Sequence, residues 1–131
     1  MSYRSREAAA RAQDRRDRED AATRLLSVVP NITSLRLDYR ELRDGATLVQ
    51  YTRLVVVARA PALFEIACSD SDCEDGMHDL TRTILNALRD NRTDFIAEDN
   101  CRGHRRDRPC GRLLVVRLLA TYDSSLLASS P

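Results

Sequence analysis

Lysine and tryptophan are absent from this sequence, and aromatic residues make up only 5% of it. All 21 basic residues are therefore arginine, and 20 acidic residues bring the formal net charge to +1. So small a net charge excludes the strongly basic proteins that bind nucleic acid or membranes through overall charge alone. Exclusive use of arginine indicates either recognition of phosphate by guanidinium groups or the codon usage of a GC-rich bacterial genome, and we favour the second interpretation.

Long apolar runs are also missing. No stretch approaches the roughly 20 apolar residues that span a bilayer, and residues 1–20 lack the apolar core of a secretory signal. We therefore expect a cytoplasmic protein without membrane attachment. Because the cytoplasm is reducing, its cysteines favour metal binding over disulfide bonds.

Catalytic motifs are missing as well, since the chain has no nucleotide-binding loop and no nucleophile triad. The signature of zinc deaminases is incomplete, because Pro109-Cys110 lacks the second cysteine and His78-Asp79 is not followed by the required glutamate. We expect a non-enzymatic protein with no small-molecule substrate. A small metal-dependent enzyme remains a minor alternative.

The 131 residues suffice for one domain with an appendage. Residues 1–30 are predicted to form a helical arm, because the segment 5–29 is rich in alanine, lacks glycine and ends at Pro30. We expect the charged first half to project and the apolar second half to pack on the domain. Residues 31–123 are predicted to form a zinc-stabilised α+β domain, and residues 124–131 a flexible tail.

After the helical arm, apolar residues recur at every second position. Leu35, Leu37 and Tyr39 alternate with charged residues, as in a strand that has one exposed face. Asp44-Gly45 then predicts a tight hairpin turn into a second strand. The pattern is typical of a small, mostly antiparallel sheet, for which we expect three to five strands.

The second strand and two further strands complete this prediction. Residues 47–59 contain a continuous apolar run at 54–58, which predicts a strand that is covered on both faces or central in its sheet. A short strand within 62–67 leads to Cys68. The segment 112–122 is apolar on both faces and predicts a central strand beside 47–59.

The four cysteines lie in two pairs that flank one predicted helix. Cys68 and Cys73 form a C-x4-C pair, whereas Cys101 and Cys110 form a C-x8-C pair. Four thiolates at tetrahedral geometry suit Zn²⁺, so we predict one structural zinc site with four cysteine ligands. Two disulfide bonds, or free thiols, are the alternative.

One ion can bind both pairs only if the helix between them is short. Its apolar positions follow the three-and-four spacing of a packed helix that begins after Asp79. A helix that ended near Asn91 would be about 18 Å long, and the segment with Phe95 and Ile96 would return the chain to the first pair. A helix that ran to Ala97 would hold the pairs on the order of 30 Å apart.

Two histidines lie close to the cysteines. His104 forms a C-x2-H spacing with Cys101 and is a possible alternative metal ligand. His78, just before the helix, is another possible alternative ligand. We expect both to be surface histidines.

Opposite charges flank the two cysteine pairs. The first turn carries acidic residues: Asp70, Asp72, Glu74 and Asp75. The second turn carries arginines: Arg102, Arg105, Arg106 and Arg108. Closing both turns around one ion brings these charges together, so part of the arginine cluster is expected to be neutralised internally.

The predicted function is attachment to nucleic acid or to a nucleoprotein machine such as the ribosome or the transcription apparatus. Phosphate contacts would come from the second turn and from the arm. The candidate residues are Arg102, Arg105, Arg106, Arg108, Arg15 and Arg16. The alternative is a protein–protein adaptor that uses the N-terminal helix or a sheet edge.

Overall fold

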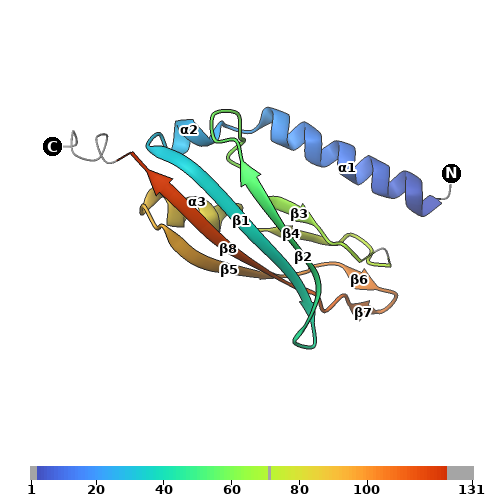
Figure 1. Ribbon diagram of the computed structural model, residues 1–131. Helices are drawn as coiled ribbons and strands as arrows, with labels where there is room; N and C mark the ends of the chain where they lie inside the picture. The colour runs from blue at the N-terminus through green and yellow to red at the C-terminus, as the bar shows by residue number, and fades with distance from the viewer. Residues whose placement is uncertain (1–2, 71, 124–131) are drawn as a thin grey trace.

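The computed structural model describes residues 3–70 and 72–123 (Figure 1). In chain order the elements are α1 (Tyr3–Ala21), α2 (Leu25–Val28), β1 (Ile32–Arg43), β2 (Ala46–Val55), β3 (Glu65–Ala67), β4 (Met77–Asp79), α3 (Thr81–Arg89), β5 (Asp94–Asn100), β6 (His104–Arg105), β7 (Arg108–Pro109) and β8 (Leu113–Tyr122). The tail predicted over 124–131 lies outside the described residues. No helix in the described ranges is long and apolar enough to cross a membrane.

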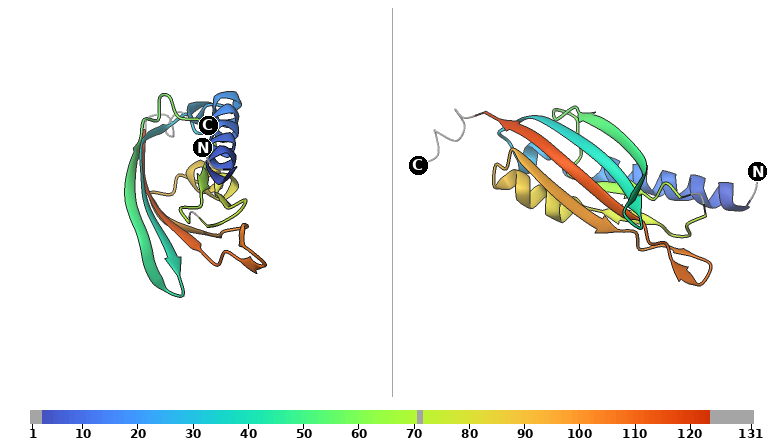
Figure 2. Two further views of the ribbon diagram at one scale, coloured as in Figure 1. Left: turned by 90° about the vertical axis from the view of Figure 1, so that its right-hand side faces the viewer. Right: turned by 60° about the horizontal axis from the view of Figure 1, so that its bottom comes forward.

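The prediction of an α+β fold with a mostly antiparallel sheet and a packed helix is confirmed. An antiparallel four-stranded sheet has the order β2-β1-β8-β5, and β3-β4 and β6-β7 form separate two-stranded pairs. Figure 2 shows the helices on one face of the large sheet. The core lies on this face, where Leu37 of β1 and Leu118 of β8 belong to the same buried cluster as Ile84 and Leu88 of α3.

The prediction of one helix over 5–29 is wrong, because the helix is interrupted between Ala21 and Leu25. There the backbone pairs with the segment 60–62 instead of continuing its helical bonds. The N–H of Leu25 donates to the carbonyl oxygen of Ala60 at 2.8 Å, and the N–H of Ala62 donates to that of Thr23 at 2.7 Å. The apolar second half packs on the domain as expected, since Leu25 is fully buried.

The predicted hairpin joins β1 and β2. Asp44 and Gly45 have φ angles of 52° and 81°, and Arg43 lies opposite Ala46. Positive φ at both central residues is the conformation of a type I′ turn, which Asp-Gly favours. The hairpin prediction is therefore confirmed.

The prediction that the apolar run at 54–58 belongs to a strand covered on both faces or central in its sheet is wrong. Strand β2 ends at Val55 and lies at the edge of the sheet, with β1 as its one neighbour among the described strands, so it is not central. The side chain of Leu54 is 74% exposed, because Leu54 lies opposite the exposed Arg36 of β1 and so shares the face of the sheet away from the buried Leu37. Strand β8 is central as predicted, but its neighbours are β1 and β5 rather than β2.

This edge position predicts a small effect of truncating Leu54. Leu54→Ala is expected to change the free energy of unfolding by less than about 0.5 kcal/mol, because the side chain is already in water. Urea unfolding followed by circular dichroism measures the change. A loss of about 2–5 kcal/mol would instead indicate the fully covered strand that the sequence suggested.

The short helix that a single site requires is confirmed. Helix α3 ends at Arg89, and Asn91 adopts a left-handed conformation with φ 57°. Strand β5 then runs antiparallel to β8, with Phe95 opposite Leu118. This returning strand places Cys101 beside the loop between β3 and β4.

Candidate metal centre

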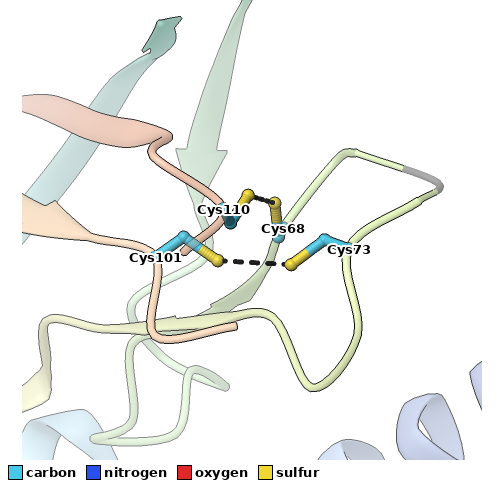
Figure 3. Close-up of side chains that lie close together, drawn as sticks. All are labelled: Cys68, Cys73, Cys101 and Cys110. Atoms are coloured by element: carbon cyan, nitrogen blue, oxygen red, sulfur yellow. Dashed lines mark hydrogen bonds between the residues drawn. The ribbon is translucent and has the colours of Figure 1, made fainter. Parts of the chain in front are cut away.

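The four cysteines converge from two loops. Figure 3 shows their side chains turned toward one another, Cys68 and Cys73 from one loop and Cys101 and Cys110 from the other. The closest sulfurs come from different loops: the Sγ atoms of Cys68 and Cys110 are 3.7 Å apart, and those of Cys73 and Cys101 are 3.6 Å apart. All four sulfurs lie within 4.8 Å of one another and could hold a metal ion.

These separations fit a shared metal ion better than disulfide bonds. Sulfurs bound to one tetrahedral ion at about 2.3 Å lie about 3.8 Å from each other, whereas bonded sulfurs lie about 2.05 Å apart. All four thiols are free. The observed distances of 3.6 Å and 3.7 Å are therefore close to those of a tetrahedral site.

Backbone hydrogen bonds hold the two loops together independently of the sulfurs. Glu74 and His104 exchange N–H to carbonyl bonds of 2.8 Å and 3.0 Å, which join the loops as a short bridge. The N–H of Cys101 donates to Arg112 at 2.8 Å, and that of Cys110 donates to Gly103 at 3.0 Å. The positions of the cysteines are thus fixed by main-chain contacts.

Two glycines allow the loops to approach this closely. A Cβ atom on Gly76 would clash with the Sγ of Cys73 and would lie 2.7 Å from the Cβ of Cys68. A Cβ atom on Gly103 would clash with the same Sγ and lie 2.5 Å from the carbonyl oxygen of Glu74. Any side chain at either glycine would therefore displace a sulfur or the backbone beside it.

Arg43 lies beside the sulfurs, and Asp70 holds its guanidinium group in place. Arg43 donates to the carboxylate of Asp70 at 2.9 Å and to the carbonyl oxygen of Cys110 at 3.0 Å, with its Nη2 atom 3.9 Å from the Sγ of that cysteine. Hydrogen bonding from Arg43 lowers the pKa of Asp70. Positive charge beside the sulfurs offsets the negative charge that thiolates bring to a metal site.

The predicted pairing of opposite charges is confirmed for Arg105, whose guanidinium lies 3.3 Å from the carboxylates of both Asp70 and Asp72. Arg102 differs from the prediction, because it pairs with Asp99 of β5 at 3.6 Å rather than with the acidic turn. Two of the four arginines of the second cysteine loop are therefore paired with acidic residues.

The thiols need a cation in order to ionise together. Burial raises the pKa of Cys68 and of Cys73. Burial acts in the same direction on Cys110, but the backbone N–H of Arg112 and the neighbouring thiols outweigh it and lower the pKa of Cys110. A bound metal ion deprotonates its thiol ligands outright, so this donor set suits a soft or borderline ion.

The expectation that both histidines lie at the surface is wrong for His78, which is fully buried. Burial alone would lower the pKa of His78, but contacts with Cys68 and Glu41 and the charges of Glu41 and Asp99 raise this pKa to about 9. His104 is 46% exposed and lies 3.3 Å from Glu74. Neither histidine belongs to the four-sulfur group, but His78 forms a second possible metal-binding group with Glu41 and Cys68.

Glu41 and Asp99 were not predicted as site residues, although the sequence contained a sign of the first. The alternation that buries Leu37 and Tyr39 continues to Glu41, which is only 3% exposed. A charged residue at an inward position of a strand indicates a partner inside the protein. Asp99 could not be identified this way, because its burial depends on the register of β5 against β8.

The arginines predicted to bind nucleic acid are partly brought together. A hollow of about 750 Å³ is lined by residues of the β6-β7 hairpin and its surroundings: Arg43, Asp72, Arg105, Arg106, Asp107, Arg108, Pro109 and Cys110. Arg102 is not among the lining residues, and neither are Arg15 and Arg16 of α1. The structure therefore unites three of the six predicted arginines with Arg43, which was not predicted.

Comparison of the chain with protein family models, with curated proteins and with solved structures gave no match. The chemistry of the cysteine group and of its surroundings is therefore the basis for assigning a function.

Proposed function

We propose that this protein is a small non-enzymatic binding module in which one structural Zn²⁺ ion is held by Cys68, Cys73, Cys101 and Cys110. The sulfur separations of 3.6 Å and 3.7 Å carry this proposal. Four thiolates are the donor set that zinc prefers in structural sites. Such a site requires a reducing compartment, which agrees with a cytoplasmic location.

The zinc ion is proposed to have a structural role. Cysteine ligands fill all four positions of a tetrahedral ion, so no position is left for water or substrate. The pairs β3-β4 and β6-β7 have two strands each, and isolated two-stranded pairs are marginally stable in water. A metal cross-link between their loops supplies the stability that these pairs lack.

The proposed partner is nucleic acid, alone or within a nucleoprotein complex. Support comes from the hollow at the β6-β7 hairpin, where Arg105, Arg106 and Arg108 lie around one space with Arg43 of β1. Guanidinium groups bind phosphate through paired hydrogen bonds. Because Cys101 and Cys110 flank the hairpin, the zinc site would hold these arginines in position.

The arginines of this hollow are not equally available. Arg43 and Arg105 already pair with Asp70. Arg106 and Arg108 are exposed, and no ion pair of either is found in the described part of the chain. We therefore assign the main phosphate contacts to Arg106 and Arg108, which predicts modest affinity.

Binding to a labelled single-stranded RNA at increasing salt concentration tests this assignment. The affinity is expected to fall with salt by about 0.7 in log K per phosphate contact for each log unit of salt. The double variant Arg106→Ala/Arg108→Ala is expected to bind more weakly and to lose about 0.7 of salt slope for each arginine removed. Fluorescence anisotropy measures both quantities.

Arg82→Ala/Arg89→Ala provides the matched control. It removes the same charge from exposed positions of α3, away from the hairpin (Figure 1). This control should retain the wild-type affinity and salt slope. Equal losses in both double variants, or binding that does not depend on salt, would count against the hairpin as a phosphate-binding site.

A protein partner is the second candidate, and the edge of β2 that no described strand covers favours it. Arg53 is the one charged residue between Ala46 and Val55, and Leu48 and Leu54 are 48% and 74% exposed. A long, apolar and nearly uncharged edge is suited to pairing with a strand of another chain. Affinity purification with and without nuclease distinguishes the candidates, because a complex through β2 survives nuclease.

A further inference from the structure

A buried polar cluster lies beside the four sulfurs and contains unsatisfied atoms. His78 is fully buried, yet neither of its ring nitrogens has a hydrogen-bond partner in the described ranges. Asp99 has an unsatisfied Oδ2 atom, and Arg112 an unsatisfied Nε atom. Buried polar groups are nearly always satisfied, so this concentration of exceptions needs a physical explanation.

The distances in this cluster are those of metal ligands. The Nε2 atom of His78 lies 3.4 Å from the Oε1 atom of Glu41, outside hydrogen-bond geometry. Nitrogen and oxygen ligands bound to one tetrahedral zinc ion at about 2.0–2.2 Å lie about 3.4 Å apart. The ligand atoms of Glu41, His78 and Cys68 all lie within 4.8 Å of one another.

The second ring nitrogen of His78 faces another carboxylate. Its Nδ1 atom lies 3.4 Å from the Oδ2 atom of Asp99, on β5. Histidines that bind metal usually direct their other ring nitrogen to a carboxylate, which fixes the tautomer and the orientation of the ring. Asp99 is therefore positioned to orient the ring of His78, while the Nε2 atom of His78 remains directed toward Glu41.

The charge of the cluster also favours a cation. Glu41, Asp99 and the sulfur of Cys68 surround the imidazole with anionic or ionisable groups. Arg112 supplies a positive charge 3.5 Å from Glu41 and contacts its Oε2 atom, whereas Oε1 accepts from the backbone N–H of Ser69 at 3.2 Å and also faces His78. Glu41 thus has Arg112 and Asp99 has the exposed Arg102 at 3.6 Å, and the positive charge between the two carboxylates is held either by a proton on the imidazole or by a metal ion that displaces this proton.

We propose that Glu41, His78 and Cys68 form a second zinc site, with the sulfur of Cys68 shared between the two ions. Oε1 of Glu41 and Nε2 of His78 are its other ligands, and Asp99 is a positioning residue. Because the bridging thiolate belongs to the four-cysteine centre, this inference rests on the proposed function. Glu41 is 3% exposed and His78 is fully buried, so the second ion would link β1 and β4 to the cysteine loops from inside the protein.

Metal counting on the folded, full-length chain tests the proposal. The protein is saturated with Zn²⁺, freed of loosely bound ions, and examined by elemental analysis and native mass spectrometry. Two zinc ions per wild-type chain are expected. Glu41→Gln keeps the size of the side chain and an oxygen that accepts from Arg112, and it is expected to lower the count to one.

The control Glu98→Gln makes the same change at an exposed position of β5 and should keep both ions. Asp99→Asn is expected to weaken binding of the second ion roughly 10- to 100-fold without changing the first, as loss of a residue that orients a ligand does. Zinc competition with a chelator measures this difference.

The possible outcomes separate this proposal from the four-cysteine site. One ion in the wild type and one in Glu41→Gln would overturn the second site and leave the first intact. No ion in a folded wild-type chain would overturn both. Two ions in wild type and in Glu41→Gln would show that the second ion binds elsewhere, which also overturns the assignment to this cluster.

Discussion

Replacing Cys101 with serine is expected to release the zinc ion of the four-cysteine site and to abolish the cooperative thermal unfolding of the domain. Structural zinc contributes about 10–16 kcal/mol of apparent binding free energy in small metal-binding folds. Complete domains are stable by only about 5–15 kcal/mol. Loss of this contribution therefore exceeds what the core of a domain of 131 residues is expected to retain.

Far-UV circular dichroism during heating, together with zinc analysis, measures this effect. His104→Gln is the matched control, because His104 lies in the same loop but is 46% exposed and outside the four-sulfur group. The control should keep its zinc and its transition. A Cys101→Ser protein that melts like the wild type would show that the cysteine group does not support the fold.

Gly103→Ala is expected to disrupt the metal centre although all four cysteines are unchanged. The added methyl group would overlap the Sγ of Cys73 and would lie 2.5 Å from the carbonyl oxygen of Glu74. Neither atom can move freely, because the sulfur is a proposed ligand and the carbonyl belongs to the bridge between the loops. Overpacking of a rigid site costs about 1–3 kcal/mol, and we expect the upper end of this range together with weaker zinc binding.

Gly45→Asn is the control for this substitution. Gly45 also has a special role, with φ 81° in the hairpin turn, but no atom lies within 4 Å of a Cβ placed there. Asparagine tolerates this conformation, so the control should lose less than about 1 kcal/mol and keep its zinc. Equal zinc affinity in Gly103→Ala and in the wild type would contradict the tight contact between the loops.

The sequence correctly predicted that a single metal site requires a short helix between the cysteine pairs, because this requirement follows from geometry alone. Two cysteine pairs on either side of a helix can meet only if the helix is short and a returning segment follows it. The helix ends at Arg89, and Phe95 lies in the returning strand β5. Helix rise and chain length were sufficient for this prediction, without knowledge of the tertiary contacts.

Features that depend on strand order could not be predicted in the same way. Continuous apolar residues at 54–58 indicated a covered strand, yet β2 lies at the edge of the sheet and Leu54 is 74% exposed. Apolar content alone does not distinguish a central strand from an edge strand that faces a partner. The interruption before Leu25 depends likewise on backbone bonds to residues 60–62, which are distant in sequence.

The cluster of Glu41, His78 and Asp99 shows a third kind of difficulty. Each residue comes from a different strand, and only Glu41, at an inward position of β1, gives a sign of burial within its own segment of the sequence. Only the register of β1 against β8, and of β5 against β8, brings the two carboxylates close to the histidine. Spacing within the sequence identified the cysteines because their pairs are local, whereas this cluster is not.

Zinc content of the folded protein, purified without added metal and examined by native mass spectrometry, is the most direct test of the four-cysteine centre. We predict at least one zinc ion per chain, and we predict that a chelator which removes the last ion also removes the cooperative unfolding transition. A chain that is folded, unfolds cooperatively and contains no metal ion would contradict the account.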